Sequence, residues 1–206
     1  MKFFNKYRLF FLILLLLTSA QVLAEEKLSQ LLSNVQTSRA DFTQTIMSAR
    51  GQILQQVSGK MTIQRPGHFR WEVTQPNRQL LIADGQHIWF YDIDLQQVTI
   101  QKQKTAHRDS PAALLSESPK NLSQLFNIHP LMDVQGFTLL PKNKNELFQS
   151  ITLIFQKNRL SEMRLIDKLE QQTAINFSQV EINPYLPANT FHFFMPKDKN
   201  IEIVNG

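Results

Sequence analysis

The sequence predicts a mainly β protein built on an antiparallel sheet. From Asp41 to residue 101, and again after residue 134, short segments with apolar side chains are separated by turn residues, a pattern typical of strands joined by hairpins. Apolar residues at helical spacing are confined to residues 25–36 and to short runs between 112 and 126. We therefore expect strands to make up most of the fold.

The first expected element is an amphipathic helix over Glu25–Gln36, whose apolar residues recur at i, i+3, i+4 and i+7 and form one stripe. Further on, Ala112–Ser116 and a segment from Pro119 to Phe126 are expected to be short helices, since proline is tolerated in a first helical turn. The expected strands are Phe42–Ala49, Leu54–Gln64, Phe69–Thr74, Gln79–Ala83, His87–Asp92, Gln97–Gln101, Val134–Leu140, Ser150–Phe155, Leu160–Asp167, Thr173–Glu181 and one near Phe191–Met195.

Residues 1–24 are typical of a cleaved secretory signal peptide. Three basic residues precede the apolar run Leu9–Leu17, and Val22-Leu23-Ala24 provides a cleavage site before Glu25. The run is short for a membrane anchor, which needs ~20 apolar residues. We therefore expect residues 25–206 to form a single mature domain.

Composition narrows the function of this mature chain. It keeps 19 basic residues against 17 acidic ones, a balance too even to favour nucleic-acid binding. The chain contains no cysteine, so it has no disulfide and no cysteine after the cleavage site that could carry a lipid of its own. Its 182 residues suffice for one hydrophobic core.

Asp84-Gly85 predicts a two-residue turn between two apolar strands. In that register, Leu81 lies opposite Ile88 on one face, and Leu80 lies opposite Trp89 on the other. Both faces of this hairpin are then apolar, so we expect both to be covered.

The hairpin around Pro66-Gly67-His68 is predicted to separate an apolar face from a polar one. A three-residue loop over Pro66–His68 pairs Arg65 with Phe69, Ile63 with Trp71 and Met61 with Val73, whereas a two-residue turn mixes apolar and charged side chains on each face. A slip of one residue moves every side chain to the other face, so the pattern favours the three-residue loop. Arg65 then belongs to the apolar face.

An arginine at the rim of an apolar face needs partners, because its guanidinium keeps its proton and is costly to bury unpaired. It could lie over the ring of Phe69. It could also donate to backbone carbonyls that are left free at the ends of nearby helices. Alternatively, the Arg65 side chain could extend past the apolar face so that its guanidinium reaches solvent. The residue pattern alone leaves all three open.

An ordered series of motifs resembles the outer-membrane lipoprotein carrier protein family, LolA. Single pieces are weak signals, but their order over essentially the whole mature chain is specific. The motifs are Asp41-Phe42-Thr43-Gln44, Arg65-Pro66-Gly67-His68-Phe69-Arg70-Trp71, Thr74-Gln75-Pro76, Asp84-Gly85, Trp89-Phe90-Tyr91, Ser110-Pro111, Leu140-Pro141-Lys142, and Phe191-His192-Phe193 with Pro196.

The resemblance implies an incomplete, unclosed antiparallel β-barrel with an α-helical lid over an apolar cavity. It also implies a periplasmic carrier: an inner-membrane ABC transporter releases lipoproteins, the carrier shields their acyl chains, and an outer-membrane receptor lipoprotein receives them. The receptor of the same pathway is expected to share the fold but is itself a lipoprotein, so the missing cysteine after the signal peptide indicates the carrier. We expect a monomer that acts in the periplasm without a cofactor.

Residue roles follow from the same resemblance. Arg65 matches the arginine that latches the lid, Phe69 the aromatic residue linked to handover from the transporter, and Trp71 an inward-facing aromatic residue. We expect the bonds of Arg65 to the backbone of the closed lid to break when lipid enters. The expected acyl-chain cavity comprises Met61, Ile63, Phe69, Trp71 and Val73, and the expected lid residues are Leu28, Leu31, Leu32, Val35, Leu114 and Leu115.

Two observations stand against a simple transfer of these roles. Ala112-Ala113 places small residues where the family often has larger apolar ones, which affects how the lid packs. In addition, an ordinary sheet core and an ordinary packed helix would account for the same apolar residues.

Rival functions have weaker support in the sequence. It contains no G-x-S-x-G or H-E-x-x-H motif, no glycine-rich phosphate loop, and five scattered histidines, so we expect neither an enzyme nor a metal site. Asp92 and Asp94 are better explained as a solvated hairpin end than as cation ligands. A periplasmic lipid- or lipoprotein-sensing domain, or a carrier of another lipid, is the alternative function. The basic segment Lys102–Arg108 is either a solvated loop or a docking site.

Overall fold

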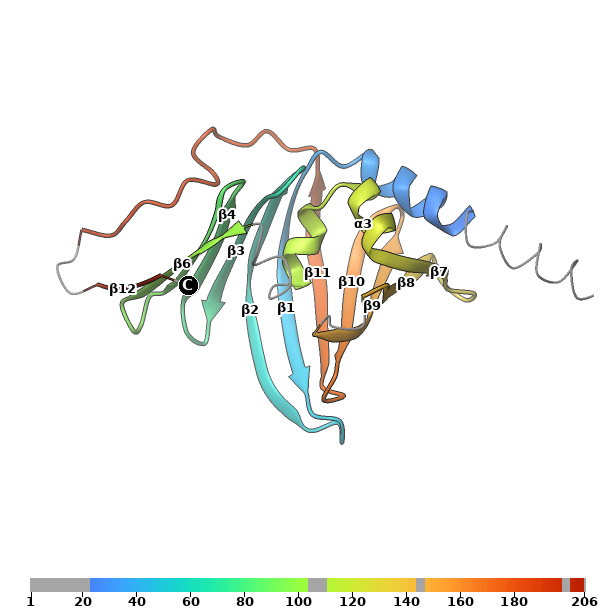
Figure 1. Cartoon of the computed structure of the whole chain (residues 1–206), viewed down its shortest axis with the longest axis horizontal. Helices are drawn as coiled ribbons and strands as arrows, with labels where there is room; N and C mark the ends of the chain where they lie inside the picture. The colour runs from blue at the N-terminus through green and yellow to red at the C-terminus, as the bar shows by residue number, and fades with distance from the viewer. Residues whose placement is uncertain (1–22, 104–110, 144–146, 198–200, 206) are drawn as a thin grey trace, which may run out of the picture.

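A computed structural model describes residues 23–103, 111–143, 147–197 and 201–205, and these form one twelve-stranded sheet with short helices on one side (Figure 1). Most of the predicted signal peptide and residues 104–108 of the basic segment lie outside the described residues. The sheet is not closed into a barrel, because β12 and β7 stand at the two ends of the strand order. The predicted mainly β architecture with an unclosed antiparallel sheet is confirmed, apart from the parallel pairing of β12 with β6.

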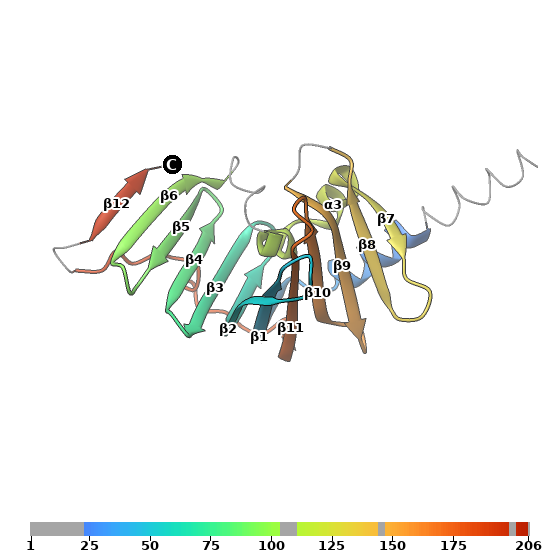
Figure 2. The same ribbon diagram turned by 90° about the horizontal axis from the view of Figure 1, so that it is seen from below.

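Neighbouring strands are antiparallel except for β12, which pairs with β6 in parallel. The order is β12-β6-β5-β4-β3-β2-β1-β11-β10-β9-β8-β7, so the pairing of β1 with β11 joins the two halves of the chain. Figure 2 shows that the sheet curves around the helices. The strands are β1 (Thr37–Met47), β2 (Ile53–Gln64), β3 (His68–Gln75), β4 (Gln79–Asp84), β5 (His87–Asp92), β6 (Gln97–Lys102), β7 (Phe126–Pro130), β8 (Gly136–Pro141), β9 (Phe148–Gln156), β10 (Arg159–Asp167), β11 (Gln172–Ile182) and β12 (Glu202–Asn205).

Helical segments within the described ranges lie on the concave side of this sheet (Figures 1 and 2). They are a helix over residues 23–33, the 3₁₀ helix η1 (Pro111–Ser116) and α3 (Pro119–Leu125). The hydroxyl of Ser118 accepts a hydrogen bond from Asn121 N (3.2 Å) and caps α3. We call residues 23–33 and η1 the covering helices.

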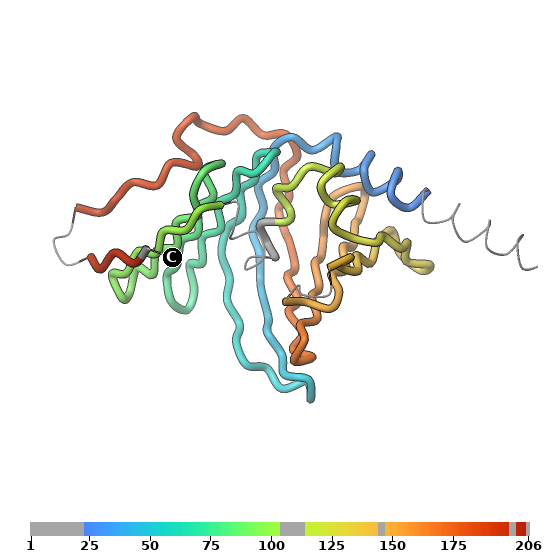
Figure 3. Tube along the Cα trace, in the orientation of Figure 1, coloured from blue at the N-terminus to red at the C-terminus, as the bar shows by residue number. Residues whose placement is uncertain are grey.

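Hydrophobic residues gather in two clusters. The larger one joins the covering helices to the concave face of the sheet. The smaller one lies on the opposite face, where Phe191 and Phe193 pack against β4, β5 and β6. They belong to the segment that leaves β11 and runs back to β12 (Figure 3). Both faces of the β4–β5 hairpin are therefore covered, as predicted.

Several predicted boundaries are wrong. The first helix ends at residue 33 instead of Gln36, and β7 begins at Phe126, where the sequence predicted helix. Phe191–Met195 was predicted to be a strand, but it is not one. Its buried and exposed residues alternate because Phe191 and Phe193 pack on the sheet, although the backbone of the segment does not pair with a strand. Strand β12 was not predicted.

Both predicted hairpin registers are wrong by two residues, although the faces are right. Gln64 pairs with His68, which leaves a loop of Arg65, Pro66 and Gly67, and Ile63 therefore pairs with Phe69. Gly67 has φ +76°, and a three-residue hairpin loop places its left-handed residue last. A shift of two residues preserves the face of every side chain because the strand period is two.

In the β4–β5 hairpin, Ala83 pairs with Ile88, and the loop is Gly85-Gln86. Asp84 was predicted inside this loop but precedes it. Its Oδ1 accepts hydrogen bonds from Gln86 N (2.8 Å) and His87 N (2.7 Å). Asp84 thus satisfies the amides of the turn from the end of β4.

Candidate functional site: an apolar pocket under the covering helices

The concave face of the sheet and the covering helices line an apolar pocket, whose empty space of about 430 Å³ includes volume open to solvent. Only a few polar groups reach it, among them Ser38, whose hydroxyl donates to Glu181 O (2.9 Å). The lining residues are Leu31, Leu32, Val35, Ser38, Ala40, Met61, Ile63, Arg65, Leu115, Phe155, Asn158, Leu160, Phe177, Val180 and Ile182.

A second apolar pocket adjoins the first and continues beneath η1 and α3, and its empty space of about 280 Å³ likewise includes volume open to solvent. The two pockets share Leu32, Arg65 and Leu115, so these side chains stand between them. Leu32 and Leu115 are only 5% and 4% exposed. A long apolar guest therefore needs the covering helices to move, because their leucines occupy the space between the pockets.

Arg65 connects the β2–β3 loop to the ends of both covering helices. Its Nη1 donates to Val35 O (2.5 Å), just beyond the first helix, and its Nε donates to Glu117 O (3.2 Å), just beyond η1. Its backbone N donates to Gln36 O (2.8 Å). Of the three arrangements open from the sequence, the structure shows donation to carbonyls at helix ends.

Burial lowers the pKa of Arg65 to about 10. The guanidinium therefore remains a cation at neutral pH, although its apolar surroundings disfavour the charge. The two carbonyl oxygens replace part of the water that it loses. Because these acceptors belong to the segments of the covering helices, moving the helices removes them.

An aromatic stack supports the sheet beside the pockets. The rings of Phe42 and Trp71 lie 3.6 Å apart between centroids, and Phe69 stacks next to Trp71 at 5.8 Å. Gly59 pairs with Phe42 across β1 and β2, and a Cβ on Gly59 would lie 2.9 Å from the Phe42 ring and 1.9 Å from Glu72 O. Only a glycine fits this position.

The predicted cavity residues all fall in the larger cluster, but not all of them line the pocket. Met61 and Ile63 do so, whereas Phe69, Trp71 and Val73 pack within the core. The predicted lid residues Leu28, Leu32, Leu114 and Leu115 are buried in the same cluster, and Leu31 packs against it. Val35 lines the pocket from beyond the helix on which it was predicted.

The other half of the pocket wall was missed. Phe155, Leu160, Phe177 and Val180 reach it from β9, β10 and β11. The strands themselves were predicted, and alternation along them identifies an apolar face. The pairing of β1 with β11, which brings that face to the site, has no local signal.

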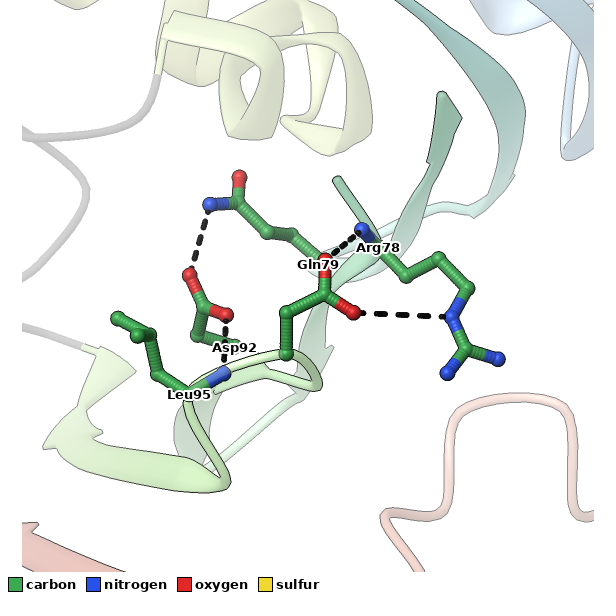
Figure 4. Close-up of polar contacts among 5 residues, drawn as sticks. Arg78, Gln79, Asp92 and Leu95 are labelled. Atoms are coloured by element: carbon green, nitrogen blue, oxygen red, sulfur yellow. Dashed lines mark hydrogen bonds and ion pairs between the residues drawn. The ribbon is translucent and has the colours of Figure 1, made fainter. Parts of the chain in front are cut away.

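The carboxylates of Asp92 and Asp94 accept hydrogen bonds at the hairpin end, and Figure 4 shows those of Asp92. Asp92 accepts hydrogen bonds from Leu95 N (3.0 Å) and Gln79 Nε2 (3.0 Å). Asp94 accepts from Arg78 N (3.1 Å) and lies 3.9 Å from its Nε. These contacts agree with the predicted solvated hairpin end.

Comparison with known proteins identifies the family. The model of the family described as "Outer membrane lipoprotein carrier protein LolA" matches residues 33–194. The chain belongs to the LolA family. Relatives named outer-membrane lipoprotein carrier protein include one from Pseudomonas putida strain KT2440, 39% identical over 178 residues (85% of this chain and 86% of the relative). Another, from Chromohalobacter salexigens, is 38% identical over 188 residues (90% of each).

Solved structures share the LolA fold at low sequence identity. A LolA superfamily protein from Nitrosomonas europaea has a TM-score of 0.51 and 10% identity, covering 82% of this chain and 97% of its own. An uncharacterized conserved protein from Thermus thermophilus has a TM-score of 0.56 and 12% identity, covering 89% and 99%. Among the described residues, none of the helices has the length and apolar character needed to cross a bilayer.

Proposed function

We propose that this protein is a periplasmic carrier that binds the acyl chains of lipoproteins between its sheet and its covering helices. One observation carries the proposal. Leucines of the covering helices cover the apolar concave face of an unclosed sheet, and Arg65 joins the ends of these helices to the sheet by hydrogen bonds. Membership of the LolA family and the names of its relatives support the same function.

The covering helices act as a lid in this proposal. In the empty protein, Leu28, Leu32, Leu114 and Leu115 occupy the apolar interior. Acyl chains displace these leucines and take their place, and Arg65 gives up its bonds to Val35 O and Glu117 O. Reclosing restores both the packing and the hydrogen bonds and thereby helps to drive the lipid out.

The partners belong to the proposal as well. An inner-membrane ABC transporter supplies the lipoprotein, and an outer-membrane receptor lipoprotein accepts it. Phe69 is proposed to take part in handover from the transporter. It is 0% exposed in the closed state, so any such contact requires the covering helices to open first.

Cargo capture from cells tests the function. A tagged copy of the protein is isolated from the periplasmic fraction of cells fed radiolabelled palmitate, and the bound material is identified by mass spectrometry. We expect lipoproteins with intact acyl chains. The matched control is a lipoprotein whose lipid-bearing cysteine is replaced by serine, which should not be recovered.

Two outcomes contradict the proposal. Equal recovery of the unlipidated lipoprotein would mean that acyl chains do not mediate binding. Recovery of phospholipid or another lipid in place of lipoproteins would favour a carrier or sensor of that lipid.

A further inference from the structure

Gln103 and Ser116, which lie at the two ends of the segment that carries η1, both form hydrogen bonds with the β2–β3 loop. Gln103 directly follows β6, and Ser116 ends η1. The side-chain amide of Gln103 donates from Nε2 to Gly67 O (2.6 Å), and Gly67 N donates to Ser116 O (2.9 Å). The backbone groups of one loop residue thus contact both ends of the segment that carries η1.

Gln103 is buried and held in one orientation. It is 5% exposed, its Oε1 accepts from Gly85 N (2.9 Å), and its own backbone N donates to Gln86 O (2.9 Å). A backbone N–H only donates and a carbonyl only accepts, so the amide of Gln103 satisfies Gly85 and Gly67 in this orientation alone. The side chain therefore joins the β4–β5 loop to the β2–β3 loop.

The fit between Gln103 and Gly67 is close. Gly67 has φ +76°, and a Cβ on it would lie 3.2 Å from Gln103 Nε2. Arg65 lies two residues before Gly67 in the same three-residue loop. The position of the Arg65 backbone therefore depends on where Gln103 holds the loop as well as on the hydrogen bond from Arg65 N to Gln36 O (2.8 Å).

The hydrogen bonds at this loop divide into two sets. Those of the Arg65 side chain, Arg65 N and Gly67 N reach residues at or just beyond the ends of the covering helices. Among the described residues, those of Gln103 join the β2–β3 and β4–β5 loops to the end of β6. Displacing the covering helices breaks the first set and leaves the second intact.

We propose that Gln103 is a positioning residue for Arg65. It holds the β2–β3 loop in its closed-state geometry while the covering helices are displaced, so that Arg65 meets Val35 O and Glu117 O again when they return. This inference rests on the proposed carrier function and adds to it a residue that lies outside the lining of both pockets. Loss of Gln103 therefore slows unloading and leaves loading intact.

Two variants separate the hydrogen bonds of Gln103. Gln103→Met keeps the approximate size of the side chain and removes both of its hydrogen bonds. Gln103→Glu still accepts from Gly85 N but places a carboxylate oxygen against Gly67 O. Gln56→Glu is the matched control, since Gln56 is exposed on β2. Each protein is loaded with palmitate-labelled lipoprotein, and transfer to receptor-bearing liposomes is timed.

We expect transfer by Gln103→Met to slow about three- to tenfold, the factor that corresponds to losing one net hydrogen bond, with Gln103→Glu slower still and Gln56→Glu unchanged. In hydrogen exchange of the empty proteins, the Gly67 amide should lose protection in both Gln103 variants. Adding Gln103→Met to Arg65→Leu should slow transfer no further, because Gln103 acts through Arg65.

The readouts distinguish the possible failures. Wild-type transfer rates for both Gln103 variants would overturn the positioning role, and so would additive effects in the double variant or an equal loss of loading and unloading. If the wild-type protein itself binds no acylated lipoprotein, the proposed carrier function fails first, and that result appears in the wild-type arm.

Discussion

Replacing Arg65 by leucine tests the attachment of the covering helices most directly. The side chain makes two hydrogen bonds from a charged group, to Val35 O and Glu117 O, and bonds of this kind contribute about 1.5–3 kcal/mol each. Burial of the cation opposes closure, as the lowered pKa of Arg65 indicates. If burial cancels about half of the gain, the closed state of the variant loses about 1.5–3 kcal/mol of stability. This loss lowers the equilibrium constant for closure by roughly 10- to 100-fold.

We therefore expect Arg65→Leu to accept lipoprotein normally and to transfer it to receptor-bearing liposomes 10- to 100-fold more slowly, as estimated above. Arg65→Lys should be intermediate, because an ammonium group lacks the planar fork that reaches two carbonyls. The matched control is Arg164→Leu on β10, where the arginine is exposed and pairs with Glu162. Transfer at the wild-type rate by Arg65→Leu would refute the reasoning.

The pH dependence gives this experiment a second readout. Burial lowers the pKa of Arg65 only to about 10, so the guanidinium stays protonated at neutral and mildly acidic pH. The loss of transfer in Arg65→Leu should consequently be the same at pH 6 and pH 8. A defect confined to one end of that range would point to a different titrating group.

Three further predictions concern the loops and the second cluster. Gly67→Ala should lower the free energy of unfolding more than Gly51→Ala. Both glycines have positive φ, which costs an alanine about 1–2 kcal/mol, but only at Gly67 does a neighbour, Gln103, lie 3.2 Å from the Cβ position. Equal urea midpoints for the two variants would contradict this. Phe193→Ala should cost about 3 kcal/mol or more, because its ring stacks on Trp89 at 5.0 Å, whereas Phe194→Ala (64% exposed) should cost little; loading should survive in both. In Asp84, burial raises the carboxyl pKa, but hydrogen bonds from His87, Trp89 and Gln86 outweigh it and lower the pKa overall. That stabilisation is present above the unfolded-state pKa of about 3.9 and disappears as pH falls through the lower folded-state value. Asp84→Asn should therefore melt at a lower temperature than the wild type at pH 7, with the difference shrinking below about pH 4; a constant difference would contradict the assignment.

The fold class was predictable because its signals are local. Alternation along each strand identifies the apolar face, and the predicted faces of the β2–β3 and β4–β5 hairpins are right even though their registers are wrong by two residues. The register depends on which loop residue takes positive φ, and Gly67 takes the last position of its loop. Composition near the turn does not distinguish that position from the middle one.

The site was only partly predictable because it is assembled over long sequence separations. The pattern places Arg65 beside an apolar face, but its acceptors, Val35 O and Glu117 O, are backbone atoms 30 and 52 residues away. The pocket wall from β9 to β11 reaches the site only through the pairing of β1 with β11. Gln103 gave no signal of its own, since a buried glutamine after a strand resembles any polar loop residue.

The way in which the interior is filled bears on how tightly a carrier of this design holds its cargo. Burying an acyl chain is worth about 0.8 kcal/mol per CH₂, so a permanently empty cavity would bind lipid too strongly to release it. Here the closed state already buries Leu32 and Leu115, each worth about 1.5–3 kcal/mol. The net free energy of binding is therefore the gain from burying the guest minus two losses. One loss is the burial of the leucines that the guest displaces, and the other is the hydrogen bonds of Arg65. Under the proposed function, affinity is therefore set by the covering helices as much as by the sheet.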